Sequence, residues 1–367
     1  MQAVILSGGQ GTRLRPLTAT TPKPAVPMVN RPMIWYMVDW LARHGVNDVV
    51  MSLGFLADGL RSALEDHPVA GVTIRYVEEP EPLGTAGAVR YTADHVEGGL
   101  DERFLVLNGD VLTDFDISAE IAQHERTGAR ATLALVPVED PSAYGLVLTD
   151  DEQRVEAFLE KPKREDAPPD PRINAGAYVL EHDVLELIPP DENRSFEHDV
   201  FPQLVGNGIY GFDADGYWLD LGTPERYREA TRDLLENNLR SYLSDDLRES
   251  GRSVSASADA GACEVEANVA LDHGCVVGAG ATIGRHSVLG RDVIVSAGAK
   301  VLGSVLMNGV QVGEDAVVDQ AILGPDVSVG AEAQIEPDVV IGAGARVAPG
   351  ARVPAGSRID AAEQVAA

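Results

Sequence analysis

The sequence lacks several features that mark other classes of protein. Only two of its 367 residues are cysteine, Cys263 and Cys275, which is too few for a disulfide framework or a CxxC metal site. We therefore expect two buried thiols in a reducing compartment. No run of about 18 apolar residues occurs, so a transmembrane helix is not expected. The N-terminus has no basic leader resembling a signal peptide, and a cytoplasmic protein is expected.

Positive charge is scarce, and lysine most of all. The formal net charge is −29, and lysine occurs only as Lys23, Lys161, Lys163 and Lys300. Such a chain repels DNA, RNA and anionic membranes, so neither a nucleic acid nor a membrane is an expected partner. It also repels anionic substrates, so a phosphate-binding cleft must carry its own cations. In an arginine-rich chain, an isolated lysine can mark a site that needs a compact point charge.

The sequence divides into two parts in which apolar residues recur with different periods. Up to about residue 238, short apolar runs alternate with helical patterns, and the runs 3–6, 49–53, 72–77 and 104–107 are expected strands. The clearest helix is expected to begin near Asn30 as its N-cap, with Pro32 in its first turn, and to stop at Gly45. This alternation predicts a Rossmann-like α/β domain with a mostly parallel sheet, whose ligands bind beyond the carboxyl ends of the strands.

From about residue 257, apolar residues recur at every sixth position, often followed by glycine. They are Val277, Ile283, Leu289, Val295 and Val301, and after a break Val317, Leu323, Val329, Ile335, Ile341, Val347, Val353 and Ile359. This period predicts a β-solenoid of hexapeptide repeats, and the break predicts a loop around 303–313. The expected organisation is a domain over 1–238, a helical connector over 239–256 and the solenoid over 257–367.

The first predicted strand runs into a loop rich in glycine and arginine. Leu6 is followed by SGGQGTRLRP, and Lys23 then lies between two prolines. Glycines let backbone N–H groups approach a polyphosphate closely, and the arginines add positive charge. The loop is neither a P-loop nor a GxGxxG fingerprint. Taken singly, each of these features is equally consistent with a structural turn.

Taken together, residues 8–32, GGQGTRLRPLTATTPKPAVPMVNRP, resemble the N-terminal motif of the sugar-1-phosphate nucleotidyltransferases. Segments 79–87, 107–110, 144–145, 158–162, 174–176 and 218–222 resemble the later motifs of that family, in the family's order. The resemblance covers essentially the first 238 residues. The hexapeptide part resembles the left-handed β-helix often fused to these enzymes. The family implies Mg²⁺-dependent attack of a hexose 1-phosphate on the α-phosphate of a nucleoside triphosphate, with release of pyrophosphate.

The resemblance also implies roles for individual residues. Asp110 and Asp220 are the expected metal ligands, Arg13 and Lys23 neutralise the triphosphate, and Lys161 holds the sugar phosphate. The nucleotide contacts implied are Leu6, Gly8, Gly9, Gly11, Thr12, Arg13, Glu79, Gly84 and Thr85, and the sugar-phosphate contacts are Gly145, Glu160, Lys161 and Asn174. The sugar phosphate is already an anionic nucleophile, so positioning and charge neutralisation are what the reaction needs. Either aspartate could instead cap a helix or shape a turn.

Glu79 bears on the choice of base. The uridine- and thymidine-using relatives typically carry glutamine here, whose amide offers one donor and one acceptor. A carboxylate offers acceptors only, which matches the adjacent N1–H and N2–H₂ donors of guanine. The neighbouring EPLGTAG and the later INAGAYVL are similar to mannose-1-phosphate guanylyltransferases. GTP and mannose 1-phosphate are therefore the expected substrates, although Glu78 and Glu81 compete for the same role.

Three alternatives remain open, for the substrates, for the role of the β-helix and for the function of the whole chain. The substrate pair could be glucose 1-phosphate with UTP or dTTP. The β-helix could be an acyltransferase with His273 or His286 as its base. The chain could also be a regulatory subunit, although Arg13, Lys23, Asp110, Lys161 and Asp220 are all present. The β-helix is otherwise expected to mediate assembly into a homo-oligomer.

Overall fold

The computed structural model describes the whole chain, Met1–Ala367, apart from the side chain of Glu160. The chain forms two compact units. The first consists of Met1–Gly9, Met37–Arg61 and Pro68–Trp218, and the second of Gln10–Tyr36, Ser62–His67 and Leu219–Ala367. Of the points at which the polypeptide passes between them, one lies within the glycine-rich loop, after Gly9, and the last lies just before Asp220.

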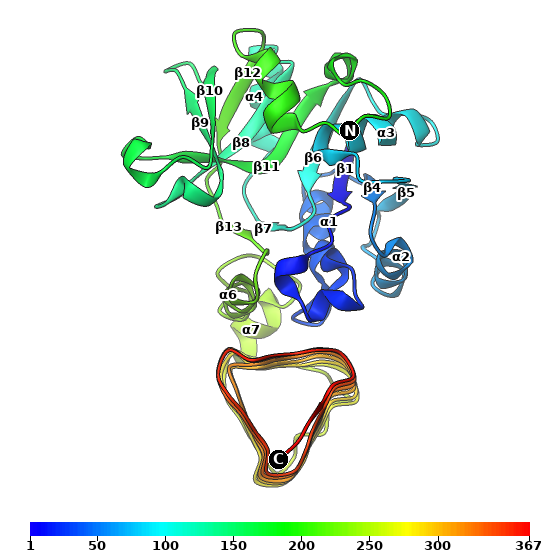
Figure 1. The fold of residues 1–367 in the computed structure, drawn as a ribbon, viewed down its shortest axis with the longest axis vertical. Helices are drawn as coiled ribbons and strands as arrows, with labels where there is room; N and C mark the ends of the chain where they lie inside the picture. Colours follow the sequence, from blue (N-terminus) through cyan, green and yellow to red (C-terminus); the bar gives the residue numbers. More distant parts are fainter. The chain divides into compact units, whose positions relative to one another are not determined.

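The first unit is built on a sheet whose parallel part follows the order β6-β1-β4-β5. These strands are β1 (Gln2–Ser7), β4 (Asp48–Leu53), β5 (Thr73–Glu78) and β6 (Arg103–Asn108), which confirms the four predicted strands to within one or two residues. Ala3, Val4 and Ile5 are wholly buried, as expected for a central strand covered on both faces. Figure 1 shows this part of the sheet, with β1 in dark blue between β6 and β4.

The sheet continues from β6 as an antiparallel extension. β11 (Arg172–Glu181) runs antiparallel to β6, β8 (Ala131–Pro137) and β9 (Gly145–Thr149). β10 (Val155–Glu160) pairs with β9, and β12 (Ile209–Asp213) pairs in parallel with β8. β7 (Val111–Thr113) and β13 (Trp218–Asp220) lie outside this sheet. The fold is therefore an α/β domain with a mixed sheet whose parallel half carries the glycine-rich loop.

Helices connect the strands. α3 (Gly84–His95) packs on β1 and β4, and α4 (Ile117–Thr127) packs on β8 and β11. The others are α1 (Met33–Arg43), α2 (Ala57–Asp66), a π-helical turn (Phe196–Val200) that leads into α5 (Phe201–Leu204), α6 (Pro224–Leu235) and α7 (Ser244–Ser250). Of these, α7 lies in the predicted connector. Among the described residues, no helix has the length and apolar character needed to span a membrane.

The start of α1 differs from the prediction. The helix begins at Met33, because residues 27–32 form a hairpin of β2 (Pro27–Met28) and β3 (Arg31–Pro32). Val29 and Asn30 form its two-residue turn with φ angles of 42° and 64°, the conformation of a type I′ hairpin. Asn30 is therefore a turn residue and not an N-cap, and its amide donates to the carbonyl oxygen of Leu289 at 3.2 Å. The helix ends at Arg43, just before Gly45, as predicted.

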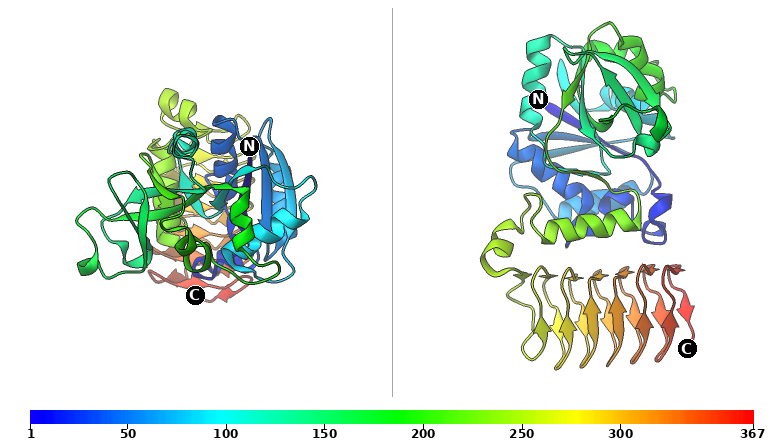
Figure 2. Two further views of the ribbon diagram at one scale, coloured as in Figure 1. Left: turned by 90° about the horizontal axis from the view of Figure 1, so that it is seen from above. Right: turned by 90° about the vertical axis from the view of Figure 1, so that its left-hand side faces the viewer.

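The predicted solenoid is a three-sided parallel β-helix, seen along its axis in Figure 1 and from the side, as stacked coils, in Figure 2. Every strand pairs in parallel with the strand one coil away, and aliphatic side chains fill the interior. The first sheet contains β14 (Ser253–Val254), β16 (Ala270–Leu271), β19 (Val288–Leu289), β22 (Val305–Leu306), β25 (Ile322–Leu323), β28 (Val340–Ile341) and β31 (Arg358–Ile359). The second contains β15 (Glu264–Val265), β18 (Thr282–Ile283), β21 (Lys300–Leu302), β24 (Val317–Asp319), β27 (Gln334–Ile335) and β30 (Arg352–Val353). The third contains β17 (Val276–Val277), β20 (Ile294–Val295), β23 (Gln311–Val312), β26 (Ser328–Val329), β29 (Arg346–Val347) and β32 (Gln364–Val365).

The loop predicted around 303–313 does not exist. The coils continue through this segment, and the change of phase comes from two corners that are each one residue shorter than their neighbours. One lies at Gly303–Ser304 and the other at Gln320–Ala321. The inward residue between these corners is therefore Val318, which is fully buried, and not Val317 as predicted.

The two cysteines belong to this β-helix and form no disulfide. Cys275 is buried in the interior, as predicted, whereas Cys263 is only partly buried, because it lies in the first coil, where fewer residues cover it. Burial raises the pKa of both thiols, to about 11 for Cys275.

Candidate active site

The carboxyl ends of the parallel strands meet at one edge of the sheet. Ser7 pairs with Leu53, Leu53 with Glu78, and Leu6 with Asn108. The segments that follow these strands, Gly8-Gly9, Gly54, Glu79 and Gly109-Asp110, therefore leave the sheet side by side. Gly109 donates its N–H to the carbonyl oxygen of Leu6 at 2.9 Å, and a Cβ there would lie 2.7 Å from that oxygen. This close approach, which needs glycine, brings Asp110 beside the end of β1.

Glu79 is held against the glycine-rich loop. Its Oε1 accepts a hydrogen bond from the Ser52 hydroxyl at 3.0 Å, and its Oε2 accepts one from the Leu83 N–H at 3.2 Å. A Cβ on Gly8 would lie 3.3 Å from Oε1, and one on Gly54 would lie 2.7 Å from the Cα of Gly8. Burial raises the pKa of the Glu79 carboxyl, an effect opposed by these two hydrogen bonds. Each carboxylate oxygen can accept further hydrogen bonds. Glu78 and Glu81, the competing carboxylates, are exposed.

The residues predicted to bind the sugar phosphate come together on the antiparallel side of the first unit. Gly145 opposes Glu160 in the β9–β10 pair, and the N–H of Lys161 donates to the carbonyl of Tyr144 at 2.9 Å. The next residue of β9, Leu146, opposes Ile173, which precedes Asn174. The side chain of Glu160 lies outside the described part of the structure, so only its backbone is placed.

Asn174 shapes the backbone around it. Its Oδ1 accepts from the Gly176 N–H at 2.9 Å, in a bulge where β11 shifts register against β8. Gly176 has φ 75°, and a Cβ there would lie 2.6 Å from the Asn108 amide. The Trp218 indole donates to the Ala175 carbonyl at 2.9 Å. The sugar-binding candidates therefore lie next to the segment that carries Asp110.

One group that sequence reasoning missed links the two sides of this unit. The Glu197 carboxylate accepts from the Tyr178 hydroxyl at 3.3 Å and from the Thr85 hydroxyl at 3.2 Å, and Asn174 donates to the same Tyr178 oxygen at 2.8 Å. The N–H groups of Ala86 and Gly87 both donate to the carbonyl of Arg194. The first turn of α3, with Gly84 and Thr85, is thus fixed to the segment before α5. The local sequence does not identify Glu197 as a linking residue. Ser195, two positions before it, has the pattern of an ordinary helix cap, so Glu197 looks like part of that cap.

The remaining candidates belong to the second unit. Gly11 has φ 59°, and a Cβ there would lie 2.9 Å from the Cβ of Lys23, whose side chain is 7% exposed. Thr12 and Arg13 form the short 3₁₀ turn that follows, Thr12–Leu14, and both are exposed. A Cβ on Gly222 would lie 2.6 Å from Arg13 Nη2 and 2.9 Å from Asp220 Oδ1. Arg13, Lys23 and Asp220 are thus carried by neighbouring segments, and the positive φ and close contact at Gly11 require glycine there.

The donor set suits a hard divalent cation. No group of three or more histidine, cysteine, aspartate or glutamate side chains in the described part of the chain could hold a metal by itself. Mg²⁺ does not need one, because it is commonly bound by one or two carboxylates together with substrate phosphates and water. Asp110 and Asp220 are carboxylates of this kind, and each is only partly buried.

The two histidines considered for acyl transfer have different surroundings. His273 is 74% exposed at its side chain and contacts Asp272. His286 lies at a corner of the β-helix, where its Nε2 contacts Glu236 Oε1 at 2.9 Å.

Known proteins share both parts of this chain. Residues 2–237 match the model of the nucleotidyl transferase family, and residues 252–353 match the left-handed β-helix domain of the EIF2B epsilon subunit. A mannose-1-phosphate guanylyltransferase of Mycobacterium tuberculosis is 36% identical over 87% of this chain and 83% of its own length. A probable mannose-1-phosphate guanylyltransferase 1 of Oryza sativa is 35% identical over 92% of this chain and 89% of its own length.

A solved structure resembles the first part. The crystal structure of HddC from Yersinia pseudotuberculosis complexed with GMP-PN has a TM-score of 0.54 and 30% sequence identity, and the match covers 62% of this chain and 97% of HddC. With its motifs, its sheet and these relatives, the chain belongs to the nucleotidyl transferase family and joins that domain to a left-handed β-helix.

Proposed function

We propose that the protein transfers the guanylyl group of GTP to mannose 1-phosphate, releasing pyrophosphate and forming GDP-mannose. The observation that carries the choice of base is Glu79, an acceptor-only group held against Gly8 by Ser52 and Leu83. The names of the relatives in Mycobacterium tuberculosis and Oryza sativa support the choice of sugar.

Glu79 reads the base by its hydrogen-bonding pattern. Both carboxylate oxygens keep lone pairs beyond the bonds that orient them, so they accept from N1–H and N2–H₂ of guanine. Uracil or thymine would turn a carbonyl oxygen towards the same carboxylate. Burying that mismatch leaves polar groups unpaired, so it costs binding free energy and discriminates against the pyrimidine. Gly84 and Thr85 complete this side of the nucleotide site.

Positive groups receive the phosphates. Leu6, Gly8, Gly9, Gly11 and Thr12 line the path of the triphosphate with backbone, Arg13 stabilises the leaving pyrophosphate, and Lys23 lies nearer the reacting phosphorus. Lys161 holds the phosphate of the sugar, whose hydroxyls bind at Gly145, Glu160 and Asn174. An oxygen of the sugar phosphate attacks the α-phosphorus in line as the bond to pyrophosphate breaks.

Asp110 and Asp220 are the proposed Mg²⁺ ligands, and the cation when bound neutralises charge on the phosphates. We further propose that residues 1–238 form the catalytic part, 239–256 the connector and 257–367 the β-helix, and that the enzyme acts in the cytoplasm. The β-helix would join copies of the chain, since Val276 and Ile294 pair across β17 and β20 and are 45% and 43% exposed.

The test is pyrophosphate release with Mg²⁺ from GTP, UTP, dTTP and ATP, each with mannose 1-phosphate and with glucose 1-phosphate. Selective turnover of GTP with mannose 1-phosphate is expected. Turnover led by UTP or dTTP would refute the role of Glu79, and no turnover with any pair would favour a regulatory subunit.

Asp110→Asn tests the proposed role of Asp110 as a Mg²⁺ ligand. It removes one negative charge from the cleft with little change in shape, so turnover should fall by about a hundredfold or more while the fold is kept. Near-normal activity would remove Asp110 from the site.

A further inference from the structure

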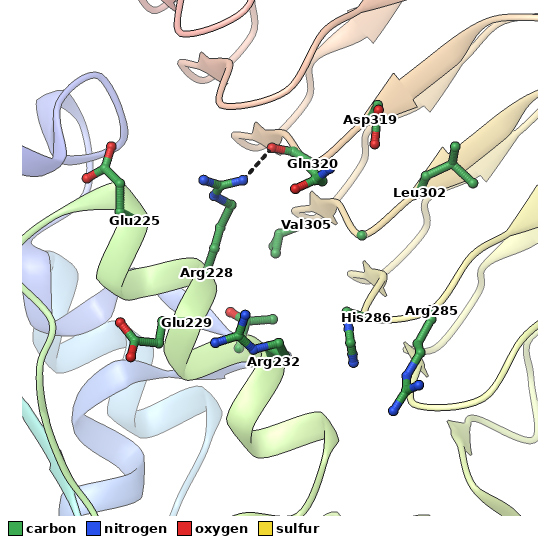
Figure 3. Close-up of a pocket in the computed structure, with 12 residues that line it drawn as sticks. Glu225, Arg228, Glu229, Arg232, Arg285, His286, Leu302, Val305, Asp319 and Gln320 are labelled. Carbon is green, nitrogen blue, oxygen red and sulfur yellow. Dashed lines mark hydrogen bonds between the residues drawn. The ribbon is translucent and has the colours of Figure 1, made fainter.

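A cavity of about 530 Å³ lies within the second unit, between α6 and the corners of the β-helix. None of the residues assigned to the proposed active site lines it. Figure 3 shows α6 on one side and the corners of successive coils on the other. Its lining residues are Glu225, Arg228, Glu229, Thr231, Arg232, Arg285, His286, Leu302, Gly303, Val305, Asp319 and Gln320.

The cavity coincides with the two shortened corners. Gly303 belongs to one and Gln320 to the other, and their φ angles of 54° and 45° keep the left-handed turn that each corner needs. The full-length corner before them contributes Arg285 and His286. Both shortened corners therefore line the cavity, next to a full-length corner.

Two arginines and a histidine line one end of the cavity. Arg285 Nη2 and His286 Nε2 both contact the same oxygen of Glu236, at 3.4 and 2.9 Å. Within the described part of the chain, the guanidinium of Arg232 makes no hydrogen bond or ion pair, and Arg232 lines the same cavity as Arg285 and His286. Arg285 and His286 thus share a single carboxylate and Arg232 has none, in a chain whose net charge is −29.

The other charges at the cavity are mostly paired. Arg228 donates to the carbonyl of Gln320 at 3.0 Å and contacts Asp338, Glu225 pairs with Arg358 at 3.3 Å, and Glu229 pairs with Arg226 at 3.4 Å. Asp319 is the exception, since its carboxylate has no partner among the described residues. Next to it, the side chain of Gln320 is exposed.

We propose that this cavity binds a small phosphorylated metabolite that carries hydroxyl groups. Its phosphate binds Arg232, with Arg285 and His286 beside it, and its hydroxyls donate to Asp319 and bond to Gln320. A guanidinium is well suited to phosphate, and an unpaired carboxylate accepts from sugar or ribose hydroxyls. Sugar phosphates and nucleotides share this chemistry, and a cavity of this size holds either.

Ligand binding in the cavity would affect catalysis through α6. α6 begins at Pro224, four residues after Asp220, so a ligand that holds α6 acts on the segment that carries a proposed metal ligand. This coupling rests on the proposed function, whereas binding in the cavity does not.

Binding is tested by hydrogen–deuterium exchange on the full chain, with glucose 6-phosphate and GMP as separate probes. We expect slower exchange in α6 and in residues 300–322. Arg232→Gln should raise the probe concentration for half-maximal protection at least about tenfold, because it removes the charge that meets the phosphate. For Arg232→Lys, which keeps the charge, this concentration should lie between those of Arg232→Gln and the wild type. Arg248→Gln is the matched control, since Arg248 is exposed on α7 and pairs with Asp245.

Protection of this region by glucose 6-phosphate alone would identify a sugar-phosphate site, and protection by GMP alone a nucleotide site. The proposal is overturned if neither probe protects α6 and residues 300–322, or if Arg232→Gln behaves like Arg248→Gln. Protection limited to residues 8–24 and 79–87 would report the candidate active site only, and would also overturn it.

Discussion

Individual carboxylates in this protein have different surroundings, and two of them allow sharp tests. Glu79 is half-buried, with one hydrogen bond to each oxygen. Glu120, on α4, is completely buried, and both of its oxygens lack a partner among the described residues. The first arrangement orients a charged group for a ligand. The second disfavours the charge itself.

Glu79→Gln tests the reading of the base. It places a donor amide where guanine presents donors, so kcat/KM for GTP should fall by about a hundredfold while that for UTP or dTTP rises relative to GTP. The measurement is kcat/KM for all four triphosphates. Glu81→Gln is the control, because Glu81 is exposed in the same loop and its loss should leave specificity unchanged. Equal effects of the two substitutions would contradict a base contact by Glu79.

Glu120→Gln tests whether burial of the charged carboxylate lowers the stability of the folded chain. Burial raises the pKa of Glu120 well above its ordinary value, so the folded chain holds this proton more tightly than the unfolded chain. Between the unfolded and folded pKa values, stability therefore falls as pH rises, by about 1.4 kcal/mol per pH unit for one proton. The variant lacks this slope, so its stability relative to the wild type should increase from pH 5 to pH 7, as measured by urea unfolding. Glu125→Gln, on the exposed side of α4, is the control; parallel pH profiles of Glu120→Gln and wild type would disprove the account.

The sequence predicted candidate site residues where a family motif contains them, and missed those that act through a second side chain. Asp110 and Glu79 follow predicted strands, so the edge of the sheet that they share could be predicted from the order of strands and motifs alone. Ser52, which orients Glu79, lies inside a buried strand and has no local signal. Glu197 contacts Thr85 only because residues far apart in the chain meet around α3.

At the scale of elements, the regular repeats were predictable and the turns were not. The hexapeptide pattern predicted the β-helix because each aliphatic residue has one fixed place in a coil. It could not separate a loop from two shortened corners, since both shift the phase. The helix expected from Asn30 began later for a similar reason. Asn suits an N-cap and the left-handed turn of a hairpin equally well, and tertiary contacts decide between them.

The Asn30 turn can be tested with a matched pair of substitutions. Asn30→Gly keeps the positive φ but loses the hydrogen bond to Leu289, whereas Asn30→Ala loses the bond and also strains the backbone. Asn30→Ala should therefore be less stable than Asn30→Gly by about 1 kcal/mol, and both should be less stable than the wild type. Urea midpoints of the three proteins provide the comparison. Equal stability of the two variants would mean that the turn relaxes without cost.

At the scale of the whole molecule, the β-helix has one covered face and two open ones. The outward residues Ala270, Val288, Val305, Ile322 and Val340 of its first sheet are at most 3% exposed. Asn30 and Arg228 reach β-helix residues from other segments of the second unit. That unit also carries Arg13, Lys23 and Asp220. The β-helix therefore supports the segments that hold the proposed phosphate-binding groups, in addition to any role in assembly.

Deleting residues 257–367 tests this role. The first unit keeps its own core, so the truncated chain should remain folded by circular dichroism and lose the assembly state of the full chain in light scattering. Its turnover should fall by about tenfold or more, because the segment 10–36, which carries Arg13 and Lys23, loses its contact from Asn30 to the β-helix. A wholly unfolded fragment would show that the boundary near residue 256 is wrong. A folded fragment with full turnover would instead restrict the β-helix to assembly, and would leave the positioning of Arg13 and Lys23 to the catalytic part alone.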